Sequence, residues 1–290
     1  MKILVTGGLG LLAHSLRQRA PRDVEPVFVD LPDFDLTQSD PMAQYLHEVR
    51  PEVVINTAAY NLVDRCEQER ELSWAVNAQG PKTLAGLCAA RDCRLVHYGS
   101  DYVFDGAKRT PYDERDTPNP LNHYGAGKLA GETAVLAASP HNLVLRTSWL
   151  FGPHPTQAKS YVHTVLRHAR SGTSLKSVTD QVAAPTYAPD LARWTWELVR
   201  RGASGLFHTV NDEGVSRYDW TRAIVKAASQ AGLLAAEIPV EQVTTAYFNP
   251  VMRRPVYTVL DNHKAATCLG EPLGSWRTGL EKMLREWGLR

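Results

Sequence analysis

The N-terminal stretch Lys2-Ile3-Leu4-Val5-Thr6-Gly7-Gly8-Leu9-Gly10-Leu11-Leu12-Ala13 decides the fold. Its apolar run, residues 3–5, predicts a strand, and the pattern from residue 11 to 19 predicts a helix. Glycines in such a turn let a diphosphate approach the backbone N–H groups at the helix N-terminus. A second predicted strand ends at Asp30, 30 − 7 = 23 residues after the first glycine, close to the separation of about 20 expected for a ribose-binding acid.

Strand and helix patterns alternate through the first half of the chain. Strands are predicted at residues 3–5, 26–30, 53–55, 94–97 and 143–146, and helices at 11–19, 41–49, 72–90 and 123–136. Such alternation is typical of a parallel sheet covered on both faces. We therefore predict an α/β fold: a Rossmann-type doubly wound parallel sheet over residues 1–150 that binds NAD(P), and a smaller mixed α/β substrate-binding lobe over 151–290, from which later segments can return to the sheet.

Further helices are predicted in the second half over residues 160–170, 189–200 and 219–230. The segment 110–122 carries three prolines and several acids, which predicts an irregular loop directly before the helix that starts at residue 123. Loops in such positions often border functional sites.

Composition excludes several classes of protein. The 290 residues are 43% hydrophobic and 22% charged, which is typical of a globular chain and not of a disordered one. The 32 basic and 31 acidic side chains leave a net charge of +1, so no nucleic acid and no membrane surface is expected as a partner. No secretory or membrane-spanning segment is recognisable, and four cysteines without a CxxC pair indicate reduced packing thiols. We expect a cytoplasmic protein with no metal site.

A tyrosine and a lysine stand four residues apart in Tyr124-Gly125-Ala126-Gly127-Lys128, so they share one face of a predicted helix. A nearby ammonium favours the phenolate, and we expect the pKa of Tyr124 to fall below its usual value of about 10. Ser100 ends a predicted strand upstream. Carbonyl reduction needs these three groups: a hydroxyl that polarises the oxygen, an acid that protonates it, and a cation that tunes the acid.

Several further motifs occur in one order along the chain. They are residues 54–60 (Val-Ile-Asn-Thr-Ala-Ala-Tyr) with Val63, Asp64 and Glu67, residues 76–78 (Val-Asn-Ala), 99–106 (Gly-Ser-Asp-Tyr-Val-Phe-Asp-Gly), 146–149 (Arg-Thr-Ser-Trp), Asp180-Gln181 with Pro185-Thr186, 205–208 (Gly-Leu-Phe-His), and 254–257 (Arg-Pro-Val-Tyr) before Leu260-Asp261. With the glycine turn and the Tyr-x-x-x-Lys pair, the chain resembles the extended short-chain dehydrogenase/reductase superfamily and, within it, the dTDP-4-dehydrorhamnose reductase family.

The resemblance implies NAD(P)H-dependent reduction of the 4-keto group of a nucleotide-linked 4-keto-6-deoxy sugar, with dTDP-4-dehydro-L-rhamnose or a related deoxysugar as substrate. The implied catalytic residues are Ser100, Tyr124 and Lys128. The implied cofactor contacts are Gly7, Gly10, Leu11, Leu12, Asp30, Asp35, Leu36, Ala58, Ala59, Tyr60, Asn77, Tyr124 and Lys128. The implied substrate contacts are Val63, Ser100, Asp101, Tyr124 and Trp149, whose ring would offer an aromatic face to the pyranose.

Some choices stay open at this point. Asp30 is followed by Leu31 and not by arginine, which favours NADH over NADPH. Arg253 and Arg254 are candidates to clamp the substrate diphosphate, since arginine suits phosphate oxygens. Alternative functions are a nucleotide-sugar epimerase of the same superfamily, or a non-catalytic subunit resembling the regulatory subunit of methionine adenosyltransferase. The oligomeric state is open, a homodimer being one assembly that the sequence allows.

Overall fold

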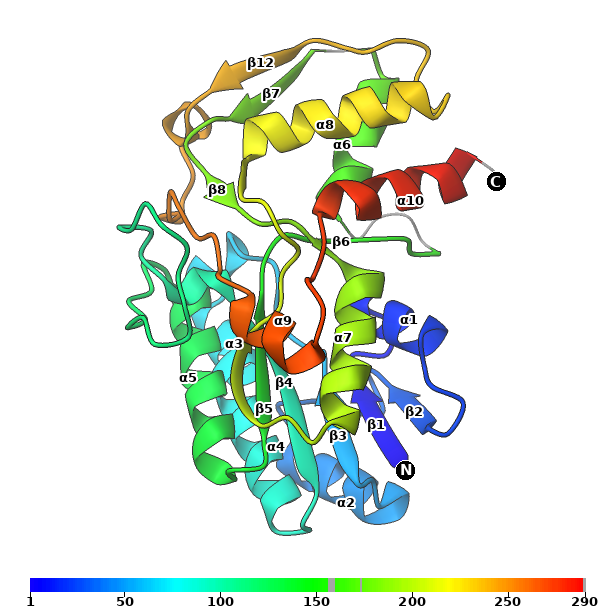
Figure 1. The fold of residues 1–290 in the computed structure, drawn as a ribbon. Helices are drawn as coiled ribbons and strands as arrows, with labels where there is room; N and C mark the ends of the chain where they lie inside the picture. Colours follow the sequence, from blue (N-terminus) through cyan, green and yellow to red (C-terminus); the bar gives the residue numbers. More distant parts are fainter. Residues whose placement is uncertain (156–159, 173, 289–290) are drawn as a thin grey trace.

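The computed structural model describes residues 1–155, 160–172 and 174–288 of the chain. Six parallel strands form its central sheet in the order β10-β5-β4-β3-β1-β2 (Figure 1). Their bounds are β1 (Lys2–Thr6), β2 (Glu25–Val29), β3 (Val53–Asn56), β4 (Arg94–Ser100), β5 (Leu143–Thr147) and β10 (Gly205–His208). The order in which strands are added changes direction between β1 and β3: β2 lies on one side of β1, and β3, β4, β5 and β10 follow on the other. Ligands bind at the carboxyl ends of the strands beside such a change of order.

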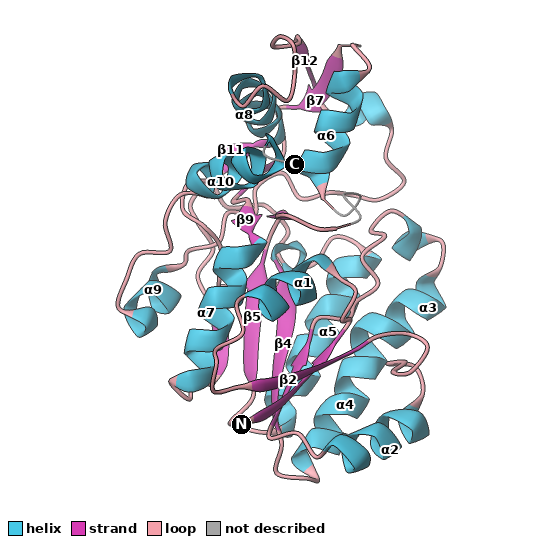
Figure 2. Cartoon of the chain, turned by 90° about the vertical axis from the view of Figure 1, so that its right-hand side faces the viewer, coloured by secondary structure: helices cyan, strands magenta, loops and turns pink. Residues whose placement is uncertain are grey.

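Successive residues of β1 enter two different cores, as the period of two in a strand requires. Ile3 and Val5 pack with α1 (Leu11–Gln18) and α7 (Ala188–Arg200). Leu4 packs on the other face with α2 (Ser39–Val49), α4 (Gly80–Ala89) and α5 (His123–Ala138). Figure 2 shows helices on both faces of the sheet, so the predicted doubly wound architecture is confirmed.

The second lobe lies beyond the carboxyl ends of the sheet strands, in the upper part of Figure 1. It contains α6 (Tyr161–Arg170), α8 (Arg217–Gln230) and α10 (Trp276–Gly288), packed around the fully buried Trp220 and Trp276. Short strands pair in twos: β7 (Leu175–Val178) with β12 (Val240–Val243), β8 (Val182–Ala183) with β11 (Val215–Ser216), and β6 (Leu150–Phe151) with β9 (Thr186–Tyr187).

The chain passes between the two parts more than once. After the first segments of the second lobe, α7 packs against α1, and β10 pairs with β5 at the edge of the sheet. The helix α9 (His263–Leu269) then contacts α7 and β10. These are later segments that return to the sheet, and each return brings a connecting segment past the carboxyl ends of the strands.

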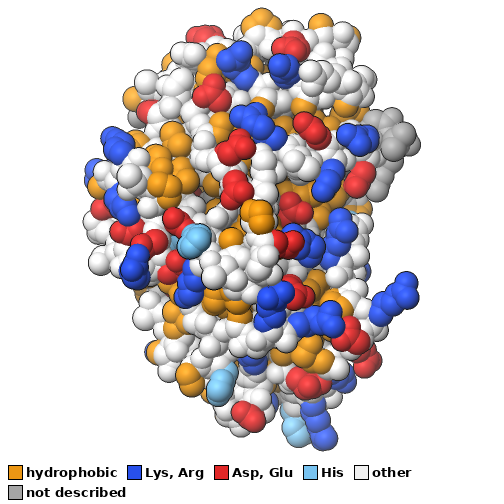
Figure 3. Space-filling view, in the orientation of Figure 1, with side chains coloured by type: hydrophobic (Ala, Val, Ile, Leu, Met, Phe, Trp, Pro, Cys, Tyr) orange, Lys and Arg blue, Asp and Glu red, His pale blue; other side chains and the backbone are white. Residues whose placement is uncertain are grey.

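Charges of both signs are mixed over the face drawn in Figure 3, in keeping with the near-zero net charge. No helix in residues 1–155, 160–172 or 174–288 is both long enough and apolar enough to cross a lipid bilayer.

Candidate active site

The turn between β1 and α1 brings backbone N–H groups to the carboxyl edge of the sheet. Gly7 has a φ of 68°, a conformation that glycine adopts at little cost. A Cβ at Gly7 would lie 2.8 Å from the backbone nitrogen of Ala58, so the turn abuts the loop that follows β3. Gly10 donates its N–H to the Gly7 carbonyl at 2.9 Å, and Leu11 and Leu12 are buried in the first turn of α1. These five predicted cofactor residues therefore form one contiguous surface.

Asp30 closes this surface from the end of β2. Its Oδ2 accepts a hydrogen bond from the backbone N–H of Leu9 at 2.7 Å, and its Oδ1 accepts one from Leu31 at 2.8 Å. The carboxylate is thus fixed beside the glycine turn, where a ribose hydroxyl can donate to it. Asp35 instead accepts hydrogen bonds from the backbone N–H and the hydroxyl of Thr37, both at 2.8 Å, and stabilises its own turn.

Asn77 holds the loop that follows β3. Its Oδ1 accepts from the backbone N–H of Tyr60 at 2.9 Å, and its Nδ2 donates to the Tyr60 carbonyl at 3.0 Å. Asn77 lies in a π-helical turn, η2 (Ala75–Gln79), between α3 (Arg70–Trp74) and α4. The single helix predicted over residues 72–90 is therefore wrong in detail, and π-turns are frequent at functional sites. The Asn77 amide positions the Ala58–Tyr60 loop.

Leu36, another predicted cofactor residue, has its side chain in the hydrophobic core below the sheet edge. A Cβ on Gly80 would lie 2.8 Å from the Leu36 Cβ, so α4 begins directly against this side chain. Leu36 therefore offers only its backbone to a ligand, while Ala59 lies half-buried in the loop after β3.

The three predicted catalytic side chains meet at the carboxyl end of β4. Tyr124 and Lys128 lie one turn apart on α5, and both are buried. The side chain of Asn122 caps the first turn of this helix. Ser100 ends β4, where its hydroxyl lowers the pKa of the Tyr124 phenol and donates to Oδ1 of Asp101 at 3.2 Å. The phenol donates to Oδ1 of Asn61 at 3.4 Å, which links it to the loop after β3.

Burial determines the protonation of Tyr124. It raises the pKa of the phenol above its usual value of 10.0, and the Asp101 carboxylate adds to the rise while the Ser100 hydroxyl opposes it. The expectation that Lys128 lowers this pKa is wrong for the protein alone, because the ammonium donates to the backbone carbonyl of Tyr98 at 2.6 Å. Tyr124 is therefore a neutral phenol at pH 7, which is the form that a proton donor needs.

A buried ion pair between Glu132 and Arg146 lies one helical turn beyond Lys128. Burial lowers the pKa of Lys128 to about 8, and the carboxylate of Glu132, one turn further along α5, opposes this shift. Glu132 pairs with Arg146 of β5, whose Nε lies 3.1 Å from both carboxylate oxygens, and both residues are buried. Nη1 of Arg146 lies 3.4 Å from Nε2 of His208 on β10. Arg146 thus holds the Glu132 carboxylate, which is the group that favours a cation at position 128.

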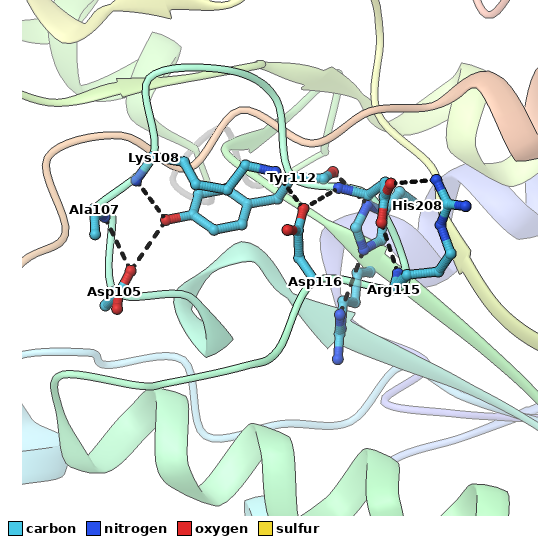
Figure 4. A network of polar contacts seen from close by, with 9 residues as sticks. Asp105, Ala107, Lys108, Tyr112, Arg115, Asp116 and His208 are labelled. Atoms are coloured by element: carbon cyan, nitrogen blue, oxygen red, sulfur yellow. Dashed lines mark hydrogen bonds and ion pairs between the residues drawn. The ribbon is translucent and has the colours of Figure 1, made fainter.

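The side chain of His208 also contacts the loop before α5, as Figure 4 shows. Its Nδ1 donates to the carbonyl of Tyr112 at 3.1 Å. The Tyr112 phenol donates to Asp105 at 3.1 Å and accepts from the backbone N–H of Lys108 at the same distance. The Lys108 ammonium pairs with Asp116 at 2.5 Å. The irregular loop predicted before α5 is confirmed, and these contacts fix its conformation beside the site.

Asp101, a predicted substrate contact, begins the short helix η3 (Asp101–Val103). Its Oδ2 accepts from the Thr258 hydroxyl at 2.6 Å, and its Oδ1 accepts from the Ser100 hydroxyl at 3.2 Å. Burial raises the pKa of Asp101 to about 6, against the opposing effects of these donors and of the Arg217 charge. The carboxylate therefore titrates close to the neutral range.

The segment that carries Met252 lies against the phenol. Met252 is buried in a small cluster with Tyr124, against which Val63, another predicted substrate residue, also packs. Arg254 anchors the same segment, since its Nη2 lies 2.8 Å from each carboxylate oxygen of Asp64. One wall of the site therefore comes from the last quarter of the chain.

Trp149 lies half-buried at the junction of the two lobes, with a φ of 40°. Its ring stacks on Trp220 with centroids 5.3 Å apart and an interplanar angle of 18°. The guanidinium carbon of Arg217 lies 3.5 Å from the Trp149 ring centroid. The expectation of a freely offered indole face therefore needs correction, because a cation already covers one face.

Sequence reasoning missed Asn61, Met252, Arg217 and Thr258. Thr258 is 157 residues from Asp101, and no local pattern marks such a pair. Of the two candidate arginines, Arg254 has its guanidinium on Asp64 at the site, whereas Arg253 contributes its backbone carbonyl, which accepts from Asn122 at 3.0 Å.

The chain is similar to known proteins over its full length. Residues 1–288 match the RmlD substrate binding domain family. A dTDP-4-dehydrorhamnose reductase of Sinorhizobium fredii is 31% identical over 296 residues, covering 100% of this chain and 98% of the relative.

Solved structures of relatives have the same fold. A dTDP-4-dehydrorhamnose reductase from Clostridium acetobutylicum superimposes with a TM-score of 0.92 at 33% identity, and the match covers 99% of each chain. Another from Bacillus anthracis, in complex with NADP, gives a TM-score of 0.90 at 30% identity, over 98% of this chain and 99% of that one. With this identity and coverage over its full length, the chain belongs to the dTDP-4-dehydrorhamnose reductase family.

Proposed function

We propose that this protein uses a reduced nicotinamide dinucleotide to reduce the 4-keto group of a nucleotide-linked 4-keto-6-deoxy sugar, with dTDP-4-dehydro-L-rhamnose as the first substrate to test. The observation that carries the proposal is the convergence of Ser100, Tyr124 and Lys128 at the carboxyl end of β4, next to the glycine turn. The relatives named above carry the matching reductase name.

The residues at the sheet edge fit a dinucleotide. The glycine turn leaves space that a side chain at Gly7 would fill, and the Asp30 carboxylate and the Ala58–Tyr60 loop flank it. We assign the diphosphate to the turn, the adenosine ribose to Asp30, and the nicotinamide end to the side of Tyr124 and Lys128. When bound, the cofactor supplies the hydride for carbon 4 of the sugar.

The protein side chains supply the proton and the charge. Ser100 donates a hydrogen bond to the carbonyl oxygen, which polarises it. As that oxygen becomes an alkoxide, the Oη–H bond of Tyr124 breaks and its proton forms the new hydroxyl. The Lys128 ammonium stabilises the phenolate that remains, and the Glu132 carboxylate opposes the lowering of the pKa of that lysine by burial.

The decisive experiment removes one oxygen atom, that of the Tyr124 phenol. Y124F removes the proton donor, and we expect kcat to fall by about 10²- to 10⁴-fold while NADH binding, measured by fluorescence titration, stays unchanged. Y45F, which removes a phenol on α2 that packs on Phe34 and lies outside the proposed catalytic set, is the matched control and should keep full activity. The product of wild-type turnover is identified by NMR after incubation with dTDP-4-keto-6-deoxy sugars, with and without a 3,5-epimerase.

Two outcomes would contradict this proposal. Wild-type protein that turns over no keto sugar would point to a non-catalytic subunit. Protein that purifies with stoichiometric nicotinamide, and interconverts sugars with none added, would point to an epimerase.

We further propose that NADH is preferred over NADPH. With the adenosine ribose assigned to Asp30, a 2′-phosphate would meet this carboxylate, and the next residues, Leu31, Pro32 and Asp33, bring no cation to that phosphate. We expect kcat/KM to be higher with NADH, and D30N to raise the relative value for NADPH by about tenfold, as removal of one charge repulsion permits. A wild-type kcat/KM for NADPH equal to or above that for NADH would overturn this preference.

A further inference from the structure

Arg217, the first residue of α8, places its guanidinium on three aromatic rings. The guanidinium carbon lies 3.5 Å from the ring centroid of Trp149, 4.5 Å from that of Tyr161 and 5.2 Å from that of Trp220. Contacts with ring faces stabilise the cation through the π-electrons. They leave the N–H groups at the rim of the planar guanidinium available for an acceptor.

No carboxylate pairs with Arg217, and no acceptor takes a hydrogen bond from its side chain, within the part of the chain that the structure describes. Arginine remains charged under all ordinary conditions and carries five N–H donors. Its neighbour in the site differs, because Arg254 binds both carboxylate oxygens of Asp64 at 2.8 Å. A half-buried guanidinium without an anion is costly unless a ligand supplies one.

The charge of Arg217 acts on the residues of the site. It opposes the rise in the pKa of Asp101, it lowers the pKa of Tyr102 against the effect of burial, and it interacts unfavourably with the charge of Arg254. The two guanidinium groups are therefore close enough to repel each other. Within the described residues Asp101 forms an ion pair with neither arginine, and its two oxygens accept from the Thr258 and Ser100 hydroxyls.

We propose that Arg217, together with Arg254, binds the diphosphate of the nucleotide sugar and thereby anchors the substrate above Trp149. This inference rests on the proposed function, since it is the sugar nucleotide that brings the diphosphate to this side of the site. Guanidinium groups bind phosphate oxygens in pairs of parallel hydrogen bonds, so one stacked arginine fixes both the position and the orientation of the group. The cofactor diphosphate has its own place at the glycine turn.

The test measures binding without turnover. Thymidine diphosphate and thymidine are titrated into the wild type, R217M and R217K by calorimetry. For R217M we expect the Kd of thymidine diphosphate to rise by about 10- to 100-fold, as loss of charge-assisted hydrogen bonds implies, with the Kd of thymidine unchanged. R217K should show a smaller rise, because an ammonium keeps the charge and loses the paired geometry. NADH binding should be the same in all three.

R222M is the matched control. Arg222 lies further along α8 and lines a groove of about 550 Å³ with Lys226 and Arg277, a second basic location on this lobe. We expect R222M to bind thymidine diphosphate as the wild type does. If R222M loses affinity and R217M does not, the diphosphate lies in that groove and the inference is overturned.

Two other results would also overturn it. Unchanged thymidine diphosphate affinity in R217M excludes the contact, and an equal loss for thymidine and its diphosphate means that Arg217 acts by packing on Trp149. Thermal unfolding of each variant identifies a folding defect, in which case R217K carries the test. Failure of the proposed function would give a different result. Protein that binds thymidine diphosphate through Arg217 but reduces no keto sugar would contradict the reductase activity and would still support the diphosphate site.

Discussion

The two edges of the proposed active site differ in the kind of contact that forms them. At the edge that we assign to the cofactor, the glycine turn, the Asp30 carboxylate and the loop after β3 are held by contacts to the backbone at the carboxyl ends of neighbouring strands. At the edge that we assign to the substrate, single side chains from distant segments meet. Thr258 reaches Asp101 across 157 residues, and Arg254 reaches Asp64 across 190.

This difference has a physical consequence for how each edge can change. A site made by backbone tolerates few substitutions, because the chain path itself is the binding surface. A site made by side chains can be altered one group at a time, with each change affecting one contact. We therefore expect changes at the cofactor edge to be severe and changes at the substrate edge to be graded.

The largest effect is expected for G7A. The φ of 68° disfavours any Cβ, and this Cβ would lie 2.8 Å from the nitrogen of Ala58, so the turn and the adjacent loop must both move. We expect the Kd for NADH to rise by about 100-fold or more, as loss of the N–H contacts to a diphosphate implies. Thymidine diphosphate binding at the other edge should change by less than about twofold if the two edges are independent.

G202A separates conformational strain from collision. Gly202 has nearly the same φ, 67°, and a Cβ there meets nothing within 4 Å. This variant should lose about 1 kcal/mol of stability in urea unfolding and keep its cofactor affinity. Equal cofactor affinities in G7A and G202A would show that the glycine turn does not contact the dinucleotide.

The second prediction concerns the buried pair of Glu132 on α5 and Arg146 on β5, next to Lys128. E132Q leaves the buried Arg146 without its partner, and we expect about 3–5 kcal/mol of lost stability. E197Q, which breaks the exposed pair with Arg201 on α7, should lose about 1 kcal/mol or less. Chemical unfolding of both variants measures this difference.

The pH profile of E132Q tests its effect on catalysis. The carboxylate of Glu132 raises the pKa of Lys128, so its removal lowers that pKa below about 8. If the ammonium is required, wild-type kcat/KM declines as pH rises through about 8, and the decline in E132Q begins at a lower pH. An alkaline limb at the same pH in both proteins would mean that Lys128 does not govern it.

The geometry of the first edge can be predicted from the sequence because its signals are local. A period of two in β1, glycines in the next turn and an acid after β2 lie within thirty residues, and backbone geometry links them directly. The Tyr124–Lys128 spacing likewise placed both side chains on one face of α5. Ser100 could be added because a residue that ends a central parallel strand lies at the same edge of the sheet.

The second edge could not be predicted in the same way. Nothing near Met252 or Thr258 in the sequence signals a contact with Tyr124 or Asp101, because the returning chain alone brings them there. The protonation of Tyr124 was also wrongly expected, since four-residue spacing describes proximity along a helix and not burial. The pattern of residues 72–90 predicts a regular helix and misses the π-helical turn around Asn77 for a similar reason, because the hydrogen bonds of Asn77 to Tyr60 are tertiary contacts.

The smallest predicted effect is that of T258V, which removes one hydroxyl at the substrate edge. The hydroxyl donates to Asp101 at 2.6 Å and stabilises the carboxylate, so its loss raises the pKa of Asp101 above about 6. We expect the KM for the sugar nucleotide at pH 7 to rise by about tenfold or less, with the Kd for NADH unchanged. T133V, which removes an exposed hydroxyl bonded to a carbonyl on α5, should change neither value.

The direction of the pH dependence separates this contact from a packing effect. In the wild type, KM should rise as pH falls through about 6, because Asp101 becomes protonated and can no longer accept two hydrogen bonds. In T258V the same rise should begin at a higher pH, since the carboxylate has lost a donor. A KM that is higher by one constant factor at every pH would show that Thr258 acts through shape, and the two edges would then differ less than their contacts indicate.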